Sequence, residues 1–156
     1  MPKFPLIMTF SEVITFGDAS LRVDGDTKVL AEFIEGMCVY SAVSAGGIEV
    51  SGTDLNQAYH SIRRAIRLVI EDCAHGTTST NSFVSEINAV FSSVDPEADA
   101  EWTKALADLR AGGLNPENGV QNLPVKPAGD IRPVRVTALP ALPADLATTD
   151  QILKAA

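Results

Sequence analysis

One amphipathic segment, residues 53–73, constrains the fold of this chain more than any other pattern. Its apolar residues recur every three or four positions, as on one face of a helix, and its arginines fall on the other side. Asp54 with Gln57 three positions later fits a capping box, although Thr53 could be the cap instead. Gly76 predicts a left-handed end to the helix. Because one face of so long a helix must be buried, we expect it to cover a sheet.

The residues before this helix alternate between apolar and polar side chains in short runs. We expect strands at 11–16, 21–24, 29–34, 37–43 and 48–50. The pairs Gly17-Asp18 and Gly25-Asp26 offer turn chemistry between the first three runs. Short strands at this spacing are typical of an antiparallel meander. The sequence therefore predicts an α+β fold, with an antiparallel β-meander of four to five strands covered by the long helix.

Two further helices are predicted downstream. The first spans about residues 82–94, where apolar side chains again share one face. The second begins at Asp95-Pro96-Glu97, which supplies a cap, a proline in the first turn and an acid at the positive end of the helix. Gly112-Gly113 ends it near Ala111.

The composition changes at this glycine pair. Residues 1–111 hold 16 acidic residues, 8 basic residues and three prolines, whereas residues 112–156 hold four of each charge and six prolines. The net charge of −8 therefore lies entirely on the first segment. We predict a compact α+β domain over residues 1–111 and an extended, proline-rich arm over residues 112–156, with a short terminal helix at 149–154.

The arm keeps scattered aliphatic residues, which an idle flexible linker would lack. Those expected to bind a partner are Ile131, Val134, Val136, Leu139 and Leu142, with Ile152 and Leu153 as anchors in the terminal helix. Our leading prediction is a non-enzymatic structural or interaction protein that docks into a larger protein assembly, such as a phage particle, through this arm. Its partners are then copies of the chain or other proteins. On this hypothesis, deletion of residues 114–156 leaves the domain folded and abolishes association.

A basic patch lies on the polar face of the long helix. It consists of Arg63, Arg64 and Arg67. Guanidinium groups can bind the carboxylates of a protein partner in bidentate pairs, so these residues are candidates for partner binding. Alternatively, they pair with carboxylates of the chain's own strands or face solvent.

No residue pattern predicts catalysis. Acidic residues gather on the expected strands and turns: Asp18, Asp24, Asp26, Glu32, Glu35 and Glu49. A metal-dependent nuclease built from these carboxylates is the enzymatic alternative, but no metal-binding motif accompanies them. Cys38 and Cys73 are expected to be small buried residues, and neither they nor the two histidines have the spacing of a zinc site or a catalytic triad. We therefore predict a protein that is not an enzyme and binds neither cofactor nor metal.

Charge and hydropathy restrict the partners further. The net charge of −8 argues against a nucleic-acid backbone as the main partner. The apolar run Leu6-Ile7-Met8 is too short for the core of a signal peptide or for a membrane span. We expect a cytoplasmic protein, or one built into a virion-like assembly made in the cytoplasm, with protein partners and no membrane contact.

The order of strands and helix is similar to that of the HicB-like antitoxin domain, a degraded RNase H-like fold. The resemblance covers about residues 20–73 and is carried by Glu35-Gly36-Met37-Cys38 and by the helix entry at 52–58. It implies a non-catalytic domain that binds a protein and often dimerises. Because no DNA-reading helix pair follows residue 76, it does not imply a repressor.

The alternative function is therefore a HicB-like antitoxin or another small acidic inhibitor, which neutralises a protein target. Its negative charge would mask a basic surface of that target. The residues expected to do so are Asp24, Asp26, Glu32 and Glu35.

Overall fold

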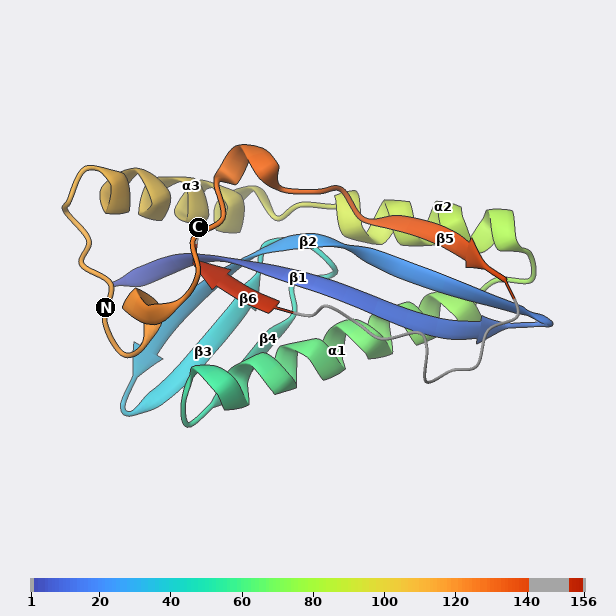
Figure 1. Cartoon of the computed structure of the whole chain (residues 1–156), viewed down its shortest axis with the longest axis horizontal. Helices are drawn as coiled ribbons and strands as arrows, with labels where there is room; N and C mark the ends of the chain where they lie inside the picture. Colours follow the sequence, from blue (N-terminus) through green and yellow to red (C-terminus); the bar gives the residue numbers. More distant parts are fainter. Residues whose placement is uncertain (1, 141–151, 156) are drawn as a thin grey trace.

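The computed structural model describes residues 2–140 and 152–155 and has the predicted α+β class (Figure 1). Its strands and helices are β1 (Lys3–Phe16), β2 (Ala19–Ile34), β3 (Met37–Ala42), β4 (Glu49–Gly52), α1 (Leu55–His75), α2 (Thr80–Ser92), α3 (Pro96–Arg110), β5 (Arg135–Leu139) and β6 (Ile152–Ala155). Two short 3-10 helices, Val120–Asn122 and Ala128–Asp130, lie between α3 and β5.

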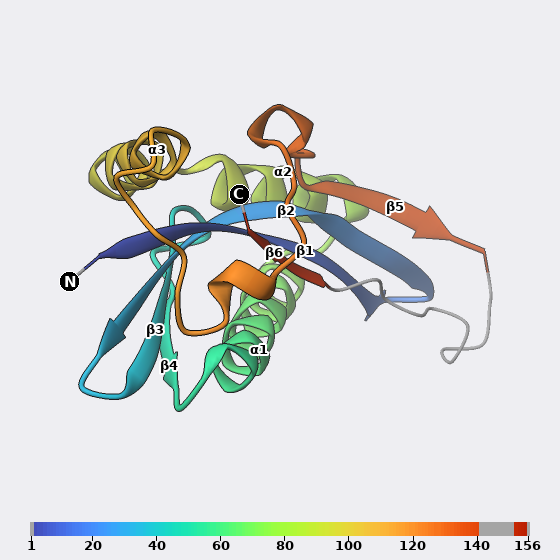
Figure 2. The same ribbon diagram turned by 60° about the vertical axis from the view of Figure 1, so that its left-hand side comes forward.

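A long hairpin of β1 and β2 forms the centre of the antiparallel sheet. The strand order is β4-β3-β2-β1-β6, and β5 also pairs with β2. β3 pairs with residues 29–34 of β2, whereas β5 pairs with residues 20–24 of the same strand. In Figures 1 and 2 the hairpin runs along the molecule between α1 on one side and α2 and α3 on the other.

Two apolar clusters hold the helices to the sheet. The larger cluster joins β1 to α1 and α2: Ile62 of α1 is fully buried, and Phe10 stacks on Phe91 with ring centroids 5.3 Å apart. The smaller cluster lies under α3, where Trp102 is 2% exposed and its Nε1 donates a hydrogen bond to the carbonyl of Leu6 at 3.0 Å. The sheet is therefore covered on more than one side, and its central strands have little free surface.

The starts of α1 and α3 follow their sequence signals. Asp54 accepts a hydrogen bond from the Gln57 amide at 2.8 Å, and the Gln57 side chain accepts one from the Thr53 amide at 2.6 Å. Asp95 caps α3 by accepting from two amides of its first turn. Gly76, by contrast, has a φ of −83° and is not the left-handed cap that we predicted, because the end of α1 closes with a right-handed turn.

β2 runs through the Gly25-Asp26 pair, which we predicted to be a turn. Gly25 and Asp26 pair with Phe10 and Thr9 of β1 in an unbroken ladder, and residues 3–10, which lie outside the expected strands, form the first part of β1. The predicted turn is wrong because Gly and Asp favour turns only where no distant contact fixes the backbone. Here the C-terminal arm packs against both residues.

The short terminal helix is wrong over its described part. Residues 152–155 form β6, which pairs antiparallel with residues 6–9 of β1. Residues 149–151 of that expected helix lie outside the described residues. A helix of one or two turns is marginal in water, whereas the edge of β1 supplies backbone partners for an extended segment.

Candidate functional site

The arm (residues 112–156) folds back over its own domain in the part that the structure describes (Figure 1). Val120 is 3% exposed and belongs to the larger cluster, against which Val134 and Val136 are half-buried. Ile131 packs against the smaller cluster under α3. The arm therefore contributes to both clusters.

Two strands of the arm extend the β1–β2 hairpin on its two edges. β5 pairs with residues 20–24 of β2, and β6 pairs with residues 6–9 of β1. The two parts of the arm also meet: Val125 forms a parallel bridge with Ala155, and the Lys126 amide donates to the Ala155 carbonyl at 2.9 Å. Extended backbone of the arm is thus bound through main-chain hydrogen bonds at the edges of the sheet.

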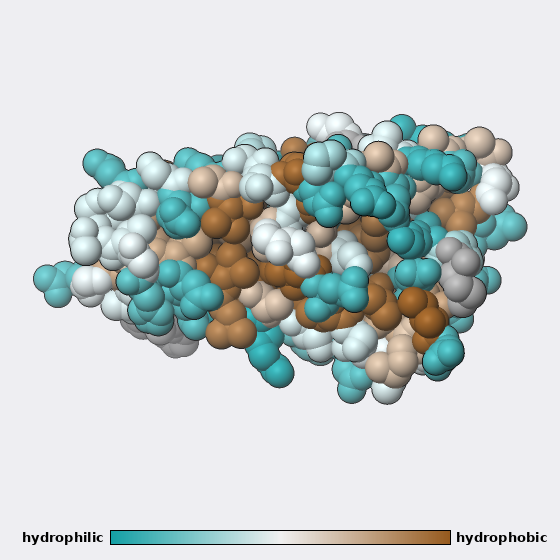
Figure 3. All heavy atoms as spheres, turned by 180° about the vertical axis from the view of Figure 1, so that it is seen from behind, coloured by the Kyte–Doolittle hydropathy of each residue, from teal (hydrophilic) through white to brown (hydrophobic). Residues whose placement is uncertain are grey.

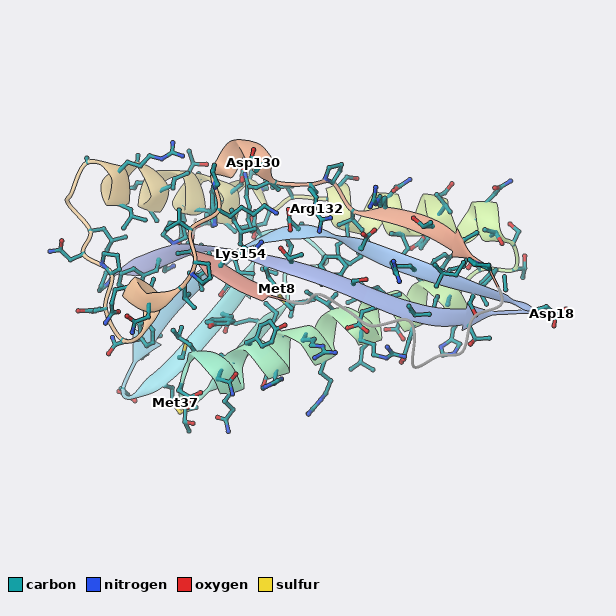
Figure 4. The ribbon with its side chains drawn as sticks, viewed as in Figure 1. Met8, Asp18, Met37, Asp130, Arg132 and Lys154 are labelled. Carbon is teal, nitrogen blue, oxygen red and sulfur yellow. The ribbon has the colours of Figure 1, made fainter. Side chains whose placement is uncertain are left out.

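A buried carboxylate fixes the middle of the arm. The Asp26 side chain is fully buried and accepts hydrogen bonds from Thr9 Oγ1 at 2.6 Å, from Lys126 Nζ at 2.5 Å and from the Arg132 amide at 2.8 Å. The Asp26 amide donates in return to the Arg132 carbonyl at 3.1 Å. Figure 4 shows Arg132 on the arm where it passes over the hairpin. One strand residue therefore binds both the charge and the backbone of the arm.

The protonation of Asp26 follows from these contacts. Burial disfavours its charged form, but hydrogen bonds from Lys126, Thr9 and the Arg132 amide outweigh the burial. The pKa of this carboxyl therefore lies below its usual value of 3.8. At neutral pH the group is ionised, and it pairs with the Lys126 ammonium.

We expect the stability that Asp26 contributes to be lost in acid. A carboxyl with a lower pKa in the folded chain stabilises the fold above its unfolded pKa of about 4, and this contribution disappears as the pH falls through the folded pKa. Urea unfolding of the wild type and of Asp26→Asn, from neutral pH to about pH 2, measures the effect. The free-energy difference between the two proteins should shrink with falling pH, whereas parallel curves would contradict the assigned ion pair.

The residues beside Asp26 complete the contact with the arm. Arg135 donates to Asp24 from Nε at 3.1 Å and from the second guanidinium nitrogen at 3.4 Å. A Cβ added to Gly25 would lie 2.7 Å from the Cα of Val134, so only glycine allows this close approach. We name this surface the arm dock; it consists of Thr9, Asp24, Gly25 and Asp26.

The aliphatic residues predicted to bind a partner lie mostly on the chain's own domain. The half-buried ones are Ile131, Val134, Val136 and Leu139. Leu142 lies outside the described residues, and only the backbone of Ile152 and Leu153 is described, as part of β6. These four side chains therefore pack against the chain's own domain, on and around the dock.

The predicted basic patch is divided by the fold. Arg67 binds Glu12 at 2.8 Å, and Arg63 Nε lies 3.6 Å from the same carboxylate, which is 3% exposed. Arg67 also pairs with Glu71 one helical turn away at 3.0 Å. Arg64 is exposed. Two of these arginines thus bind a strand carboxylate of the same chain.

A groove lies beside this pair, between the end of the β1–β2 hairpin and the second half of α1. Its volume is about 1010 Å³, and its walls include Phe16 of β1 and Arg67, Glu71 and His75 of α1. Leu139 at the end of β5 also borders it. Because the arginines along it are already paired with carboxylates, the groove offers no excess of positive charge.

The metal-ligating and thiol side chains of the described residues were the candidates for chemistry. Within residues 2–140 and 152–155, no three His, Cys, Asp or Glu side chains are placed to hold a metal ion. Asp24 and Asp26, two of the six carboxylates on which the nuclease alternative was built, bind cations of the arm. Cys38 and Cys73 are buried free thiols, and burial raises the pKa of Cys38 to about 11, so it stays protonated at neutral pH.

The exposed surface mixes polar and apolar groups (Figure 3). Seen from behind, apolar groups lie along the middle of the molecule among polar ones (Figure 3). Scattered exposed apolar side chains are usual on monomeric proteins. None of the helices in the described ranges has the length and apolarity needed to cross a membrane.

Sequence reasoning missed the cations that bind the dock. Lys126, Arg132 and Arg135 belong to the arm, and each binds a carboxylate of β2. The available signal was the contrast between an acidic domain and an arm that holds as many basic as acidic residues. That contrast predicts attraction between the two segments, but not which residues meet.

The glycines that carry the resemblance to HicB-like domains have local structural reasons. Gly36 has a φ of 80° in the turn between β2 and β3. A Cβ added to Gly52 would lie 2.5 Å from the amide nitrogen of Ala58, because β4 passes close to the start of α1. No family model, curated protein or solved structure matches this chain.

Proposed function

We propose that this protein is a non-enzymatic interaction protein that joins a multi-chain assembly through its C-terminal arm. One observation carries the proposal: an extended, proline-containing segment is bound at the edges of a sheet by strand pairing and by a buried ion pair. A phage particle is one assembly that needs such joints.

The chemistry of the dock suits recognition of an extended segment. Strand addition to a sheet edge gives affinity through main-chain hydrogen bonds, and side-chain contacts give specificity. Here Gly25 lets the backbone of the bound segment approach the sheet closely, and Asp26 requires a cation at one position of that segment. Prolines in the arm fix φ and so reduce the entropy lost when the arm becomes ordered. These features select both the sequence and the register of the bound segment.

A second candidate is the acidic inhibitor, favoured by the hairpin between β2 and β3. Ile34 and Met37 are 39% and 37% exposed there and flank Glu35, which is also exposed. Figure 4 shows Met37 at the end of this hairpin. Glu32 and Glu35, unlike Asp24 and Asp26, are not used by the dock. A basic target protein would bind this hairpin end.

One capture experiment distinguishes the two candidates. The full-length chain serves as bait in extracts of its source cells, beside Lys126→Ala/Arg135→Ala, which weakens the arm, and Glu32→Lys/Glu35→Lys, which reverses the hairpin charge. We expect the proteins bound by the wild type to be lost from the arm variant and kept by the hairpin variant. Circular dichroism checks that both variants are folded. The opposite pattern would favour the inhibitor, and identical capture by all three baits would contradict both candidates.

A further inference from the structure

We propose that the arm is exchanged between two copies of this chain, so that β5 and β6 of one copy pair with β2 and β1 of the other. This inference rests on the proposed function and names the partner as a second copy. Lys126 and Arg135 of each copy then bind Asp26 and Asp24 of the other. Donor and acceptor are both present in every chain, so the site is self-complementary in the sense that a closed dimer requires.

The arm can leave its dock without disturbing the rest of the sheet. β6 is the last strand on the β1 side, and β5 lies beside β2 beyond the residues that pair with β3. Neither strand stands between two others in the described sheet. Figures 1 and 2 show both on the outside of the β1–β2 hairpin. Opening the arm therefore leaves the pairing of β1, β2, β3 and β4 intact.

A short hinge near the start of the arm connects its docked part, from Val120 onward, to α3. Its exposed residues are Asn115, Pro116, Glu117 and Asn118. Asn118 has a φ of 54° and Gly119 a φ of 95°, so the chain reverses tightly here through left-handed backbone. After glycine, asparagine is among the residue types that most readily adopt left-handed backbone, so Asn118 and Gly119 form this turn at little cost. Exposed, tightly bent hinges of this kind are where exchange of an element between protomers begins.

The exchanged dimer makes the contacts of the closed monomer again, between two chains. The difference in free energy is then mainly the freedom of motion that the two chains lose on association. The dimer fraction consequently rises with protein concentration, as it would inside an assembly where neighbours are held close.

Engineered cysteines test the exchange directly. Arg22 and Thr137 are Cα partners between β2 and β5. Full-length Arg22→Cys and full-length Thr137→Cys are mixed at high concentration and then oxidised. The control pair is Arg22→Cys with Thr103→Cys, whose cysteine lies on the exposed surface of α3. We expect a dimer linked between the two positions, roughly tenfold or more above the control, because exchange holds them together.

Disulfide closure within a single chain, without linked dimer in the mixture, would overturn the inference. The double variant Arg22→Cys/Thr137→Cys closes within a single chain if the two positions meet only in the monomer. A mixture that gives no more linked dimer than the control, while this double variant closes internally, excludes exchange. If the arm-dependent capture described above still holds in that case, the proposed function stands with a different protein as partner.

Shortening the hinge supplies a second readout. Deletion of residues 115–117 removes three of the four exposed hinge residues and shortens the connection between α3 and the buried Val120. Because closure within one chain then becomes harder, we expect the full-length deletion variant to lose its monomer peak in sedimentation and form a dimer. A folded monomer with protected β5 amides would overturn the proposal.

Discussion

A chain that ends at Gly113 is expected to be less stable than the full chain by at least about 3 kcal/mol. The truncation uncovers the site of Val120, which is 3% exposed in the larger cluster, and removes the half-buried Val134, Val136 and Ile131. Complete burial of one such side chain contributes about 1.5–3 kcal/mol, and the entropy regained by the absent arm offsets part of the sum. We therefore expect residues 1–111 to be less stable without the arm, whereas the hypothesis from the sequence was that this domain folds alone.

Urea unfolding followed by the fluorescence of Trp102, the only tryptophan, measures this loss. A synthetic peptide of residues 114–156, added to the truncated chain, should restore part of the stability, because ligands that bind the folded state stabilise it. The control peptide carries Lys126→Ala and Arg135→Ala and should restore less. A truncated chain as stable as the full chain, and insensitive to the peptide, would show that the dock does not bind the arm in solution.

The elements that could be predicted from the sequence are those with local causes. α1 starts after Asp54 and α3 after Asp95, because each aspartate binds amides only two or three residues away. The apolar face of α1 is likewise periodic within one segment. Such signals lie within a few residues of each other, so a single segment contains all the information that determines the element.

The elements that could not be predicted depend on distant contacts. Asp26 binds residues 100 and 106 positions away, and Asp24 binds a residue 111 positions away. Without those partners, Asp24-Gly25-Asp26 has the composition of a turn. The same limit applies to β6, whose extended backbone pairs with residues 6–9 of β1 and with the arm near Val125. The missed dock and two of the wrong predictions, the turn at Gly25-Asp26 and the terminal helix, therefore have one cause.

Replacement of Asp26 by Ala is expected to destabilise the full chain by about 3–5 kcal/mol. Lys126, whose side chain is 12% exposed, would keep its charge without a partner, and the Arg132 amide would lose its acceptor. Asp24→Ala is the matched control: the Asp24 side chain is also mostly buried, but its partner Arg135 is 68% exposed and stays hydrated when the carboxylate is removed, so we expect a smaller loss. The comparison separates a carboxylate with a buried cation from a carboxylate with an exposed one on the same strand.

The double variant Asp26→Ala/Lys126→Met separates the charge from the packing. It should lose less stability than Asp26→Ala alone, because no unpaired charge remains and the methionine fills the space of the lysine stem. Urea unfolding gives the free energies, and hydrogen exchange of the β5 amides reports whether the arm has left the sheet. If Asp26→Ala costs no more than Asp24→Ala and β5 stays protected, strand pairing alone holds the arm. The dock would then accept any extended segment, and selection of a cation at position 126 would no longer be part of its function.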